Sequence, residues 1–134
     1  MPTEAPMALP KGFLRPCLLL LLREEPAHGY DLLERVQALG FDGSDPGGLY
    51  RALRALEKEN LVRSAWEPSE SGPDRRTYSI TRAGMQELHR CAKGIAAGQR
   101  VAATFMSRYQ EFVALPRGPR PVDASARSEE AALR

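Results

Sequence analysis

The chain has 134 residues, which is enough for one domain with a modest hydrophobic core and some additional elements. Its apolar fraction of 43% and charged fraction of 27% are ordinary for a globular protein. The net charge of +2 is too small to indicate nucleic-acid binding by itself. Such binding has to be inferred from where the charges lie.

The cysteines and the apolar segments favour a reducing compartment. Cys17 and Cys91 lie far apart in apolar, helix-like contexts, so both are expected to be small buried side chains rather than a disulfide. The apolar run at residues 17–22 is far shorter than the roughly 20 residues of a membrane-spanning helix. Charged residues follow it at once, without a signal-peptide cleavage site. We therefore expect a cytoplasmic protein without a membrane segment.

The first forty residues predict an arm and two helices. Residues 1–12 contain three prolines and little periodicity, which is typical of a flexible arm. Residues 13–24 have a helical pattern that is apolar on most sides, and Pro26 ends it. A second helix is predicted over residues 29–39, with Gly40 as its exit residue. Its apolar stripe consists of Leu32, Leu33, Val36 and Leu39.

The next predicted helix has two chemically different faces. Asp45 can cap it and Pro46 fits its first position. Leu49, Leu53 and Leu56 fall on one side. The other side carries Gly47, Tyr50, Arg51, Arg54 and Lys58, and Gly48 leaves further space near the helix start. This outer face suits a nucleic-acid groove, although an ordinary solvated face is the alternative.

A hairpin is predicted after this helix. Residues 61–66 and 76–80 are rich in strand-favouring types, and residues 67–75 between them are dense in turn formers. Arg75 and Arg76 lie where the return strand leaves the tip. Three helices followed by such a hairpin predict a winged helix, in which the hairpin, or wing, follows the DNA backbone. A plain surface hairpin is the alternative.

A long last helix is predicted to begin after Thr81, which can cap it, and to last to residue 115, about 50 Å. Its apolar positions repeat with 4/3 spacing: Leu88, Cys91, Ile95, Gly98, Ala102, Phe105, Tyr109 and Phe112. Because the winged core is too small to cover this stripe, we expect the same helix of a second subunit to cover it. The small residues around Gly94 and Gly98 could allow close helix approach, leave a cavity or mark a bend.

The predicted fold is therefore mainly α with a small β-hairpin, a winged helix-turn-helix followed by one dimerisation helix. The expected divisions are residues 1–12 (arm), 13–80 (DNA-binding domain), 81–115 (dimerisation helix) and 116–134 (disordered tail). The predicted dimerisation residues are Leu88, Ile95, Ala102, Phe105, Tyr109 and Phe112.

Three motifs resemble the PadR family of bacterial transcriptional regulators in order and spacing. They are His28-Gly29-Tyr30, then DPGGLYRALRALEKENLV, then SGPDRRTYSITRAG. Within the family, FLRPCLLLLLRE and SGPDRRTYSIT are most similar to a branch of polyhydroxybutyrate-responsive repressors. Two departures stand out, because Asn60 replaces a frequent glycine and Gly48 replaces a frequent serine or threonine. A left-handed backbone is expected at Asn60.

The resemblance implies a homodimeric winged helix that binds a roughly palindromic operator in double-stranded DNA and usually represses. The two recognition helices would enter successive major grooves, about 34–36 Å apart. It also implies release by a small-molecule effector, for which we expect a pocket between the long helices and the winged domain, near the small-residue segment. Neither a cofactor nor a metal is expected.

The predicted DNA contacts differ in what each side chain can reach. Arg51 and Arg54 are expected to contact bases or phosphates, and Lys58 a phosphate or nothing. The Tyr50 hydroxyl is expected to reach a phosphate or base edge, with packing against the second helix as its alternative. Arg75 and Arg76 are expected to clamp the backbone.

Tyr30 and the remaining aromatic and histidine residues carry weaker predictions. The Tyr30 hydroxyl could bond a phosphate, although packing against the core is favoured. Trp66 is expected in the core at the base of the wing, with ligand stacking as the alternative. His28 is expected to cap or pack, and His89 has no evident partner.

Two other classes of function were weighed against a DNA-binding regulator. An enzyme has little support, because no nucleophile–base pair, paired carboxylates, phosphate-binding glycine loop or metal cluster is evident in the sequence. A winged-helix protein–protein interaction module with incidental DNA binding is the alternative.

Overall fold

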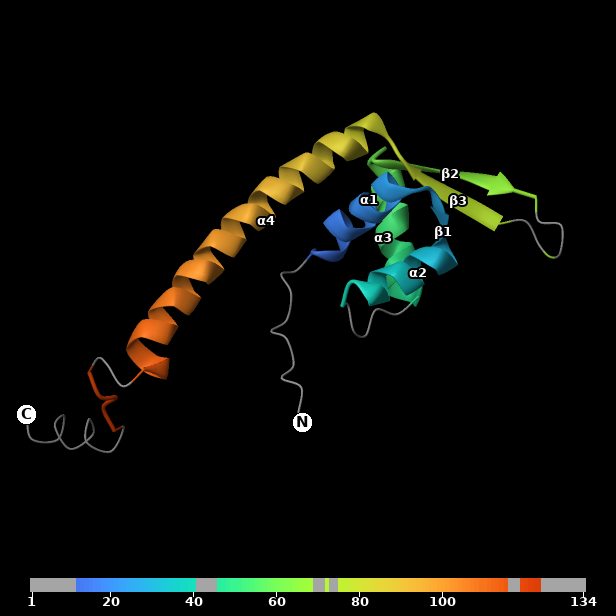
Figure 1. Cartoon of the computed structure of the whole chain (residues 1–134). Helices are drawn as coiled ribbons and strands as arrows, with labels where there is room; N and C mark the ends of the chain where they lie inside the picture. Colours follow the sequence, from blue (N-terminus) through green and yellow to red (C-terminus); the bar gives the residue numbers. More distant parts are fainter. Residues whose placement is uncertain (1–11, 41–45, 69–71, 73–74, 116–118, 124–134) are drawn as a thin grey trace, which may run out of the picture. The chain divides into compact units, whose positions relative to one another are not determined.

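The structure is a computed structural model that describes residues 12–40, 46–68, 72, 75–115 and 119–123. Its elements in order are α1 (Leu14–Glu24), β1 (Ala27–His28), α2 (Gly29–Ala38), α3 (Pro46–Lys58), β2 (Val62–Glu67), β3 (Arg75–Ile80), α4 (Arg82–Tyr109) and a π-helical turn (Gln110–Ala114) (Figure 1). The chain divides into two compact units, Met1–Ile95 and Ala96–Arg134, so α4 begins in the first unit and ends in the second. The predicted fold class, mainly α with a small sheet and a long last helix, is confirmed.

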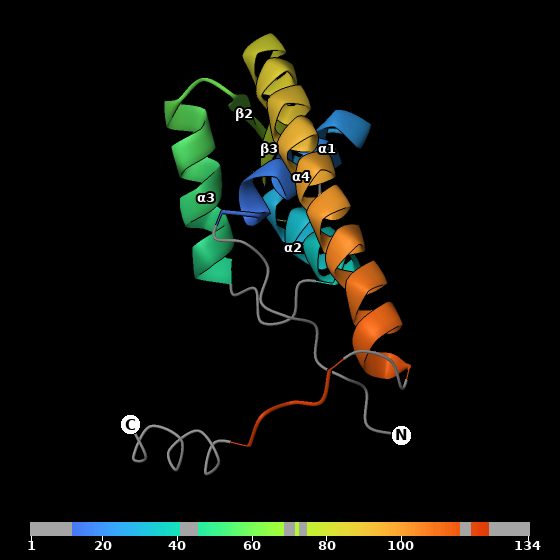
Figure 2. The same ribbon diagram turned by 90° about the vertical axis from the view of Figure 1, so that its left-hand side faces the viewer.

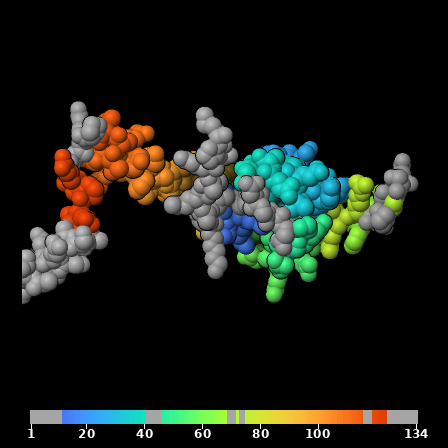
Figure 3. Space-filling model, turned by 90° about the horizontal axis from the view of Figure 1, so that it is seen from below, coloured from blue at the N-terminus to red at the C-terminus, as the bar shows by residue number. Residues whose placement is uncertain are grey.

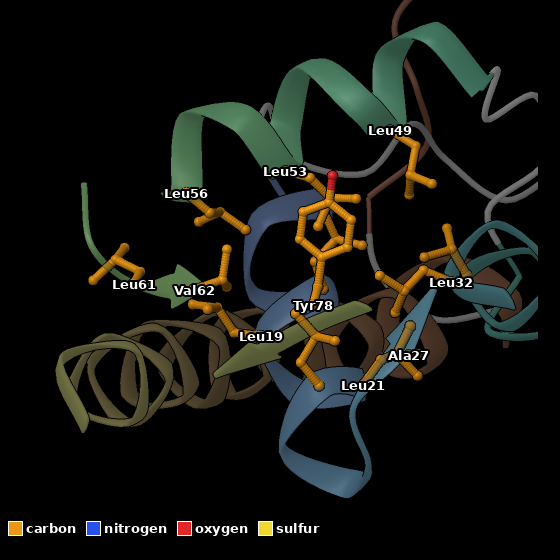
Figure 4. Close-up of a cluster of buried hydrophobic side chains, with 13 residues drawn as sticks. Leu19, Leu21, Ala27, Leu32, Leu49, Leu53, Leu56, Leu61, Val62 and Tyr78 are labelled. Atoms are coloured by element: carbon orange, nitrogen blue, oxygen red, sulfur yellow. The ribbon is translucent and has the colours of Figure 1, made fainter. Parts of the chain in front are cut away.

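The core of the first unit lies between α3, α1 and the sheet. Figure 4 shows Leu49, Leu53 and Leu56 pointing from α3 toward side chains of α1, β2 and β3. These three leucines are at most 1% exposed, which confirms the predicted inward stripe. Burying each contributes about 1.5–3 kcal/mol to folding, so this stripe fixes which face of α3 looks outward.

The sheet has three strands rather than the two that were predicted. β3 lies in the middle, with β1 and β2 antiparallel on either side. In the register of the β2–β3 hairpin, Val62 is opposite Ile80 and Glu67 is opposite Arg75. β1 pairs Ala27 with Tyr78. The sequence did not predict β1 because two residues between Pro26 and a helix are too few to alternate.

Three backbone details confirm predictions at the ends of helices. Asn60, just after α3, has φ +62°, the left-handed conformation that was expected there. Gly40, after α2, has φ +103°. Thr81 caps α4, because its Oγ1 accepts a hydrogen bond from the Gly84 backbone N–H at 3.0 Å. A Cβ built on Gly84 would lie 2.1 Å from the Leu61 carbonyl oxygen, so only glycine fits where α4 begins.

The helices α1, α2 and α3 are separate, as the sequence predicted (Figure 2). Pro16 lies in the first turn of α1, and α2 ends just before Gly40. Cys17 and Cys91 are both free thiols. Residues 1–11, Asp45 and most of the hairpin tip lie outside the described residues.

The second unit carries a set of exposed apolar side chains on α4 and the π-helical turn. The ring of Phe105 is 66% exposed and stacks on that of Tyr109, with ring centroids 6.4 Å apart. The other exposed members are Val101, Met106, Phe112, Val113 and Leu115. Within the described ranges, no helix is long and apolar enough to cross a membrane.

Candidate nucleic-acid interface

The outer face of α3 is basic. Arg51, Arg54 and Lys58 are exposed, on the side opposite the buried leucines. None of the three makes a hydrogen bond or an ion pair with another residue that the structure describes. Figure 3 shows the surfaces of α2 and α3 side by side, with the strands of the hairpin beyond them. The predicted contact residues of α3 therefore share one accessible surface, with Gly47 exposed and Gly48 half-buried at its start.

Tyr50 packs against the start of α2. A Cβ built on Gly29 would lie 2.5 Å from Tyr50 Cε1 and 2.8 Å from the Tyr50 hydroxyl oxygen. The ring therefore occupies the space that a side chain at position 29 would need. This is the packing arrangement weighed as the alternative for Tyr50, although 37% of the residue remains exposed. It also explains the glycine in the His-Gly-Tyr motif.

A cleft of about 370 Å³ lies where α2, α3 and β3 meet. Its lining combines tyrosines, arginines and the first residues of α2: His28, Gly29, Tyr30, Asp31, Tyr50, Arg75, Arg76 and Tyr78. The N-terminal end of a helix carries unpaired backbone N–H groups and a partial positive charge. The lining carries two arginines and one carboxylate, that of Asp31. Together with the start of α2, this excess of positive charge favours an anion in the cleft.

The tyrosines of the cleft are placed differently from one another. Tyr78 is only 5% exposed, and burial raises the pKa of its hydroxyl, which stays protonated at neutral pH. Tyr30 is 68% exposed, so packing of its ring against the core, which the sequence favoured, is wrong. As the second residue of α2, Tyr30 lies on the outer surface and its ring finds no apolar layer to enter. Its hydroxyl is left for an external partner.

His28 joins β1 to β3. Its Nδ1 lies 3.0 Å from Thr77 Oγ1, and the two residues are directly opposite each other in the register of β1 and β3. The imidazole makes no side-chain cap to α2. Its position agrees with the predicted packing role. Among the residues that the structure covers, no group of three or more histidine, cysteine or acidic side chains is placed to hold a metal ion.

Arg76 differs from the other predicted cations because the protein already binds its guanidinium. Its Nε donates a hydrogen bond to Ser64 Oγ at 2.8 Å. The Ser64 hydroxyl in turn donates to the Glu57 carboxylate at 2.6 Å, and Arg76 forms an ion pair with the same carboxylate at 3.5 Å. Arg75, its exposed neighbour, has no such partner in the described part of the chain. Of the two wing arginines, Arg75 is the one that no described residue binds.

Trp66 is not in the core, and that prediction is wrong. The residue is 66% exposed, because β2 extends beyond the helices that cover its beginning. The Arg76 guanidinium lies over the Trp66 ring, 5.5 Å from its centroid, and the two residues are directly opposite in the hairpin. The ring is thus held by a cation–π contact rather than by burial.

The far end of α3 is tied to α1 and α4 by charged side chains. Arg15 of α1 donates two hydrogen bonds to the Glu59 carboxylate and lies 3.6 Å from that of Glu87 on α4. The hydrogen bond from Arg15 lowers the pKa of Glu59. That of Glu87 is also lowered, chiefly by its hydrogen bond from Arg90. These contacts were not predicted, since 44 residues separate Arg15 from Glu59.

The predicted dimerisation residues fall into two groups. Leu88 is partly buried against the core of its own chain. Ile95 is 37% exposed, and the remaining predicted positions are exposed on the second unit: Ala102, Phe105, Tyr109 and Phe112. Leu88 therefore has an apolar partner within the chain, whereas the others do not enter the core.

Comparison with known proteins connects these features to a family. The model of the PadR-like family of transcriptional regulators matches residues 18–90. A PadR-like transcriptional regulator of Bacillus cereus has 27% identity and a TM-score of 0.65, over 72% of this chain and 93% of its own. TM0937, a conserved protein described as a potential transcriptional factor, has 30% identity and a TM-score of 0.68, over 81% of this chain and 100% of its own.

Two curated relatives are longer proteins. A probable transcriptional regulator of Mycobacterium tuberculosis is 34% identical over 86 residues, which are 63% of this chain and 43% of that protein. An uncharacterized 37.1 kDa protein in a transposon of Streptomyces fradiae is 34% identical over 79 residues, 22% of its length. The chain thus spans less than half the length of either. The family that matches is one of regulators rather than enzymes, and it is the family that the motifs predicted. The chain belongs to the PadR-like family of transcriptional regulators.

Proposed function

We propose that this protein is a sequence-specific DNA-binding regulator in which α3 is the recognition helix and the β2–β3 hairpin is the wing. The observation that carries the proposal is the set of exposed cations on the outer face of α3, namely Arg51, Arg54 and Lys58, which have no ion-pair or hydrogen-bond partner among the described residues. Cations along one side of a helix that enters a major groove can contact phosphates and base edges. The division into a DNA-binding domain at residues 13–80 and a dimerisation helix at residues 81–115 is part of this proposal.

The cleft at the start of α2 supports a DNA-backbone contact beside the recognition helix. Two of its exposed members, Tyr30 and Arg75, offer a hydroxyl and a guanidinium to an approaching phosphate. The N–H groups at the start of α2 add a third kind of donor. In helix-turn-helix proteins the helix before the recognition helix crosses the DNA backbone, which is where a phosphate would meet this cleft.

The test is the affinity of the protein for its own promoter region as the salt concentration rises. Each neutralised phosphate should contribute about −0.9 to the slope of log K against log salt. Arg51→Gln and Arg54→Gln should lower the affinity, whereas Arg23→Gln, a matched change at the exposed end of α1, should not. A flat slope, or equal losses at Arg23 and Arg54, would contradict the proposal.

Arg54→Ala separates base reading from phosphate binding. If Arg54 reads a base, the substitution should weaken binding to the operator by about 1–3 kcal/mol and binding to random DNA by much less. An equal loss on both DNAs would assign Arg54 to the backbone.

We further propose that a second copy of the chain covers the exposed apolar side chains of α4 and of the π-helical turn that follows it. Phe105, Tyr109 and Phe112 follow the 4/3 spacing of a helix–helix seam, and each is at least 43% exposed in the single chain. A dimer would present two recognition helices to a roughly palindromic operator. Light scattering should give twice the mass of one chain. A monomer would favour the interaction-module alternative.

Repression, a cytoplasmic location and a small-molecule effector complete the proposal. The resemblance to polyhydroxybutyrate-responsive repressors makes short hydroxybutyrate oligomers the first effectors to test. An effector can release DNA only by binding better to the DNA-free protein than to the DNA-bound protein, for example to a dimer whose recognition helices no longer fit both half-sites. A compound that raises the unfolding temperature should therefore also lower operator affinity. A stabilising compound without that effect would not be an effector.

A further inference from the structure

We propose that Glu57 is a positioning residue for DNA recognition. By binding Arg76, it fixes the wing against the recognition helix and keeps that guanidinium out of the phosphate contacts. The inference rests on the proposed DNA-binding function, and it names a residue on which specificity depends although its negative charge disfavours contact with a phosphate.

Glu57, Ser64 and Arg76 each contact the other two and lie on three different elements. Glu57 lies in the last turn of α3, Ser64 in β2 and Arg76 in β3. The Ser64 hydroxyl donates to the carboxylate at 2.6 Å and accepts from Arg76 Nε at 2.8 Å. The third contact is the 3.5 Å ion pair between Arg76 and Glu57. These contacts therefore connect the end of α3 to both strands of the wing.

The Arg76 guanidinium is bound at its edge by Ser64 and Glu57, and the Trp66 ring covers one of its faces. The ring centroid is 5.5 Å from Arg76 Cζ, within the range of a cation–π contact. A guanidinium held at its edge and on its face is costly to redirect toward a phosphate. Arg75 is one residue away on the same strand and has no ion pair or hydrogen bond within the described ranges.

The neighbouring arginines therefore provide an internal comparison. Arg75→Gln should make the slope of log K against log salt less steep by about 0.9, as expected for one lost phosphate contact. Arg76→Gln should leave the slope unchanged and lower operator affinity roughly 3- to 10-fold, the range typical of changes that act without touching the ligand. Because Trp66 is the single tryptophan of the chain, its emission reports directly on loss of the guanidinium contact.

Glu57→Gln tests the carboxylate itself. The amide can still accept from Ser64, but the ion pair is lost and Arg76 is freed. For random DNA, the slope of log K against log salt should then become steeper by up to about 0.9. The ratio of operator affinity to random-DNA affinity should fall roughly 3- to 10-fold. Glu25→Gln is the matched control, since it removes the same charge from an exposed position outside the wing and α3. It should leave both the ratio and the Trp66 emission unchanged.

The proposal is overturned if Arg76→Gln flattens the slope as much as Arg75→Gln. It is also overturned if Glu57→Gln leaves both the specificity ratio and the emission of Trp66 at their wild-type values. Emission is measured in the protein without DNA, so it tests the Glu57–Arg76–Trp66 contacts even if the wild-type protein binds no DNA. A wild-type protein that binds no DNA would contradict the proposed function instead. Thermal unfolding of each variant confirms that it is folded.

Discussion

Tyr50 lies over Gly29 so closely that a methyl group at position 29 would be 2.5 Å from its Cε1 atom. This contact joins the first residue of α2 to the outer border of α3. It also places the Tyr50 hydroxyl beside the cleft where we expect a DNA phosphate. The His-Gly-Tyr motif and the tyrosine of the recognition helix are thus parts of one arrangement.

We expect Gly29→Ala to displace the Tyr50 ring, because no carbon atom fits at the distance that the present packing requires. Overpacking of this kind costs about 1–3 kcal/mol, which urea unfolding would measure. If the hydroxyl of Tyr50 contacts DNA, operator affinity should fall at the same time.

The control for this prediction is Gly29→Ala in a Tyr50→Ala background. With the ring removed, the methyl group has space, so the two substitutions together should cost less than the sum of their separate effects. Additive costs would mean that the penalty at position 29 comes from the backbone and not from Tyr50.

The left-handed backbone of Asn60 predicts opposite outcomes for two small substitutions. Asn60→Ala should lower the free energy of unfolding by about 1–2 kcal/mol, since a Cβ disfavours φ near +62° and alanine lacks the amide that makes asparagine tolerant. Asn60→Gly should be neutral or slightly stabilising. Thermal unfolding of both variants is the measurement, and equal stability of the two would show that the backbone rearranges after α3.

Features set by neighbouring residues could be predicted from the sequence. The inward leucines of α3, the Thr81 cap and the left-handed Asn60 depend on residues within a few positions of one another. The hairpin follows from a change of period, and the basic outer face of α3 follows once its leucines are buried. The family itself was predicted from the resemblance of three sequence motifs, and the match of the family model confirms it.

Features that depend on how distant segments pack could not be predicted. The two residues of β1 become a strand only because β3 lies beside them. The internal contacts of Arg76 could not be predicted, because no local pattern shows that Glu57 and Ser64 reach it. Trp66 looked like a core residue because the sequence does not show how far β2 extends beyond the helices. Alternation along β3 could have placed Arg76 and Tyr78 on one face, and hence Tyr78 beside the cleft.

The ion pairs of Arg15 predict a pH dependence of stability. Arg15 lowers the pKa of Glu59, so the stabilising contribution is present above the unfolded pKa of a glutamate, about 4.3, and is lost as pH falls through the lower folded pKa. Arg15→Gln should therefore be less stable than wild type near neutral pH, and the two proteins should converge in acid. Urea unfolding across this range is the measurement. Because these groups are exposed, the difference should also shrink at about 1 M salt, and a difference independent of both pH and salt would contradict the assignment.

A charge placed among the exposed apolar side chains of α4 should dissociate the proposed dimer. Phe105→Asp would place a carboxylate among apolar side chains at the proposed contact, and a central aromatic side chain of this kind commonly contributes about 2 kcal/mol or more to association. Light scattering should show a shift from dimer to monomer, and operator affinity should fall because a monomer engages one half-site. Ser107→Asp adds the same charge on the opposite side of the helix and should leave the mass unchanged. If both variants remain dimeric, the subunits meet elsewhere, and the apolar side chains of the second unit need another partner.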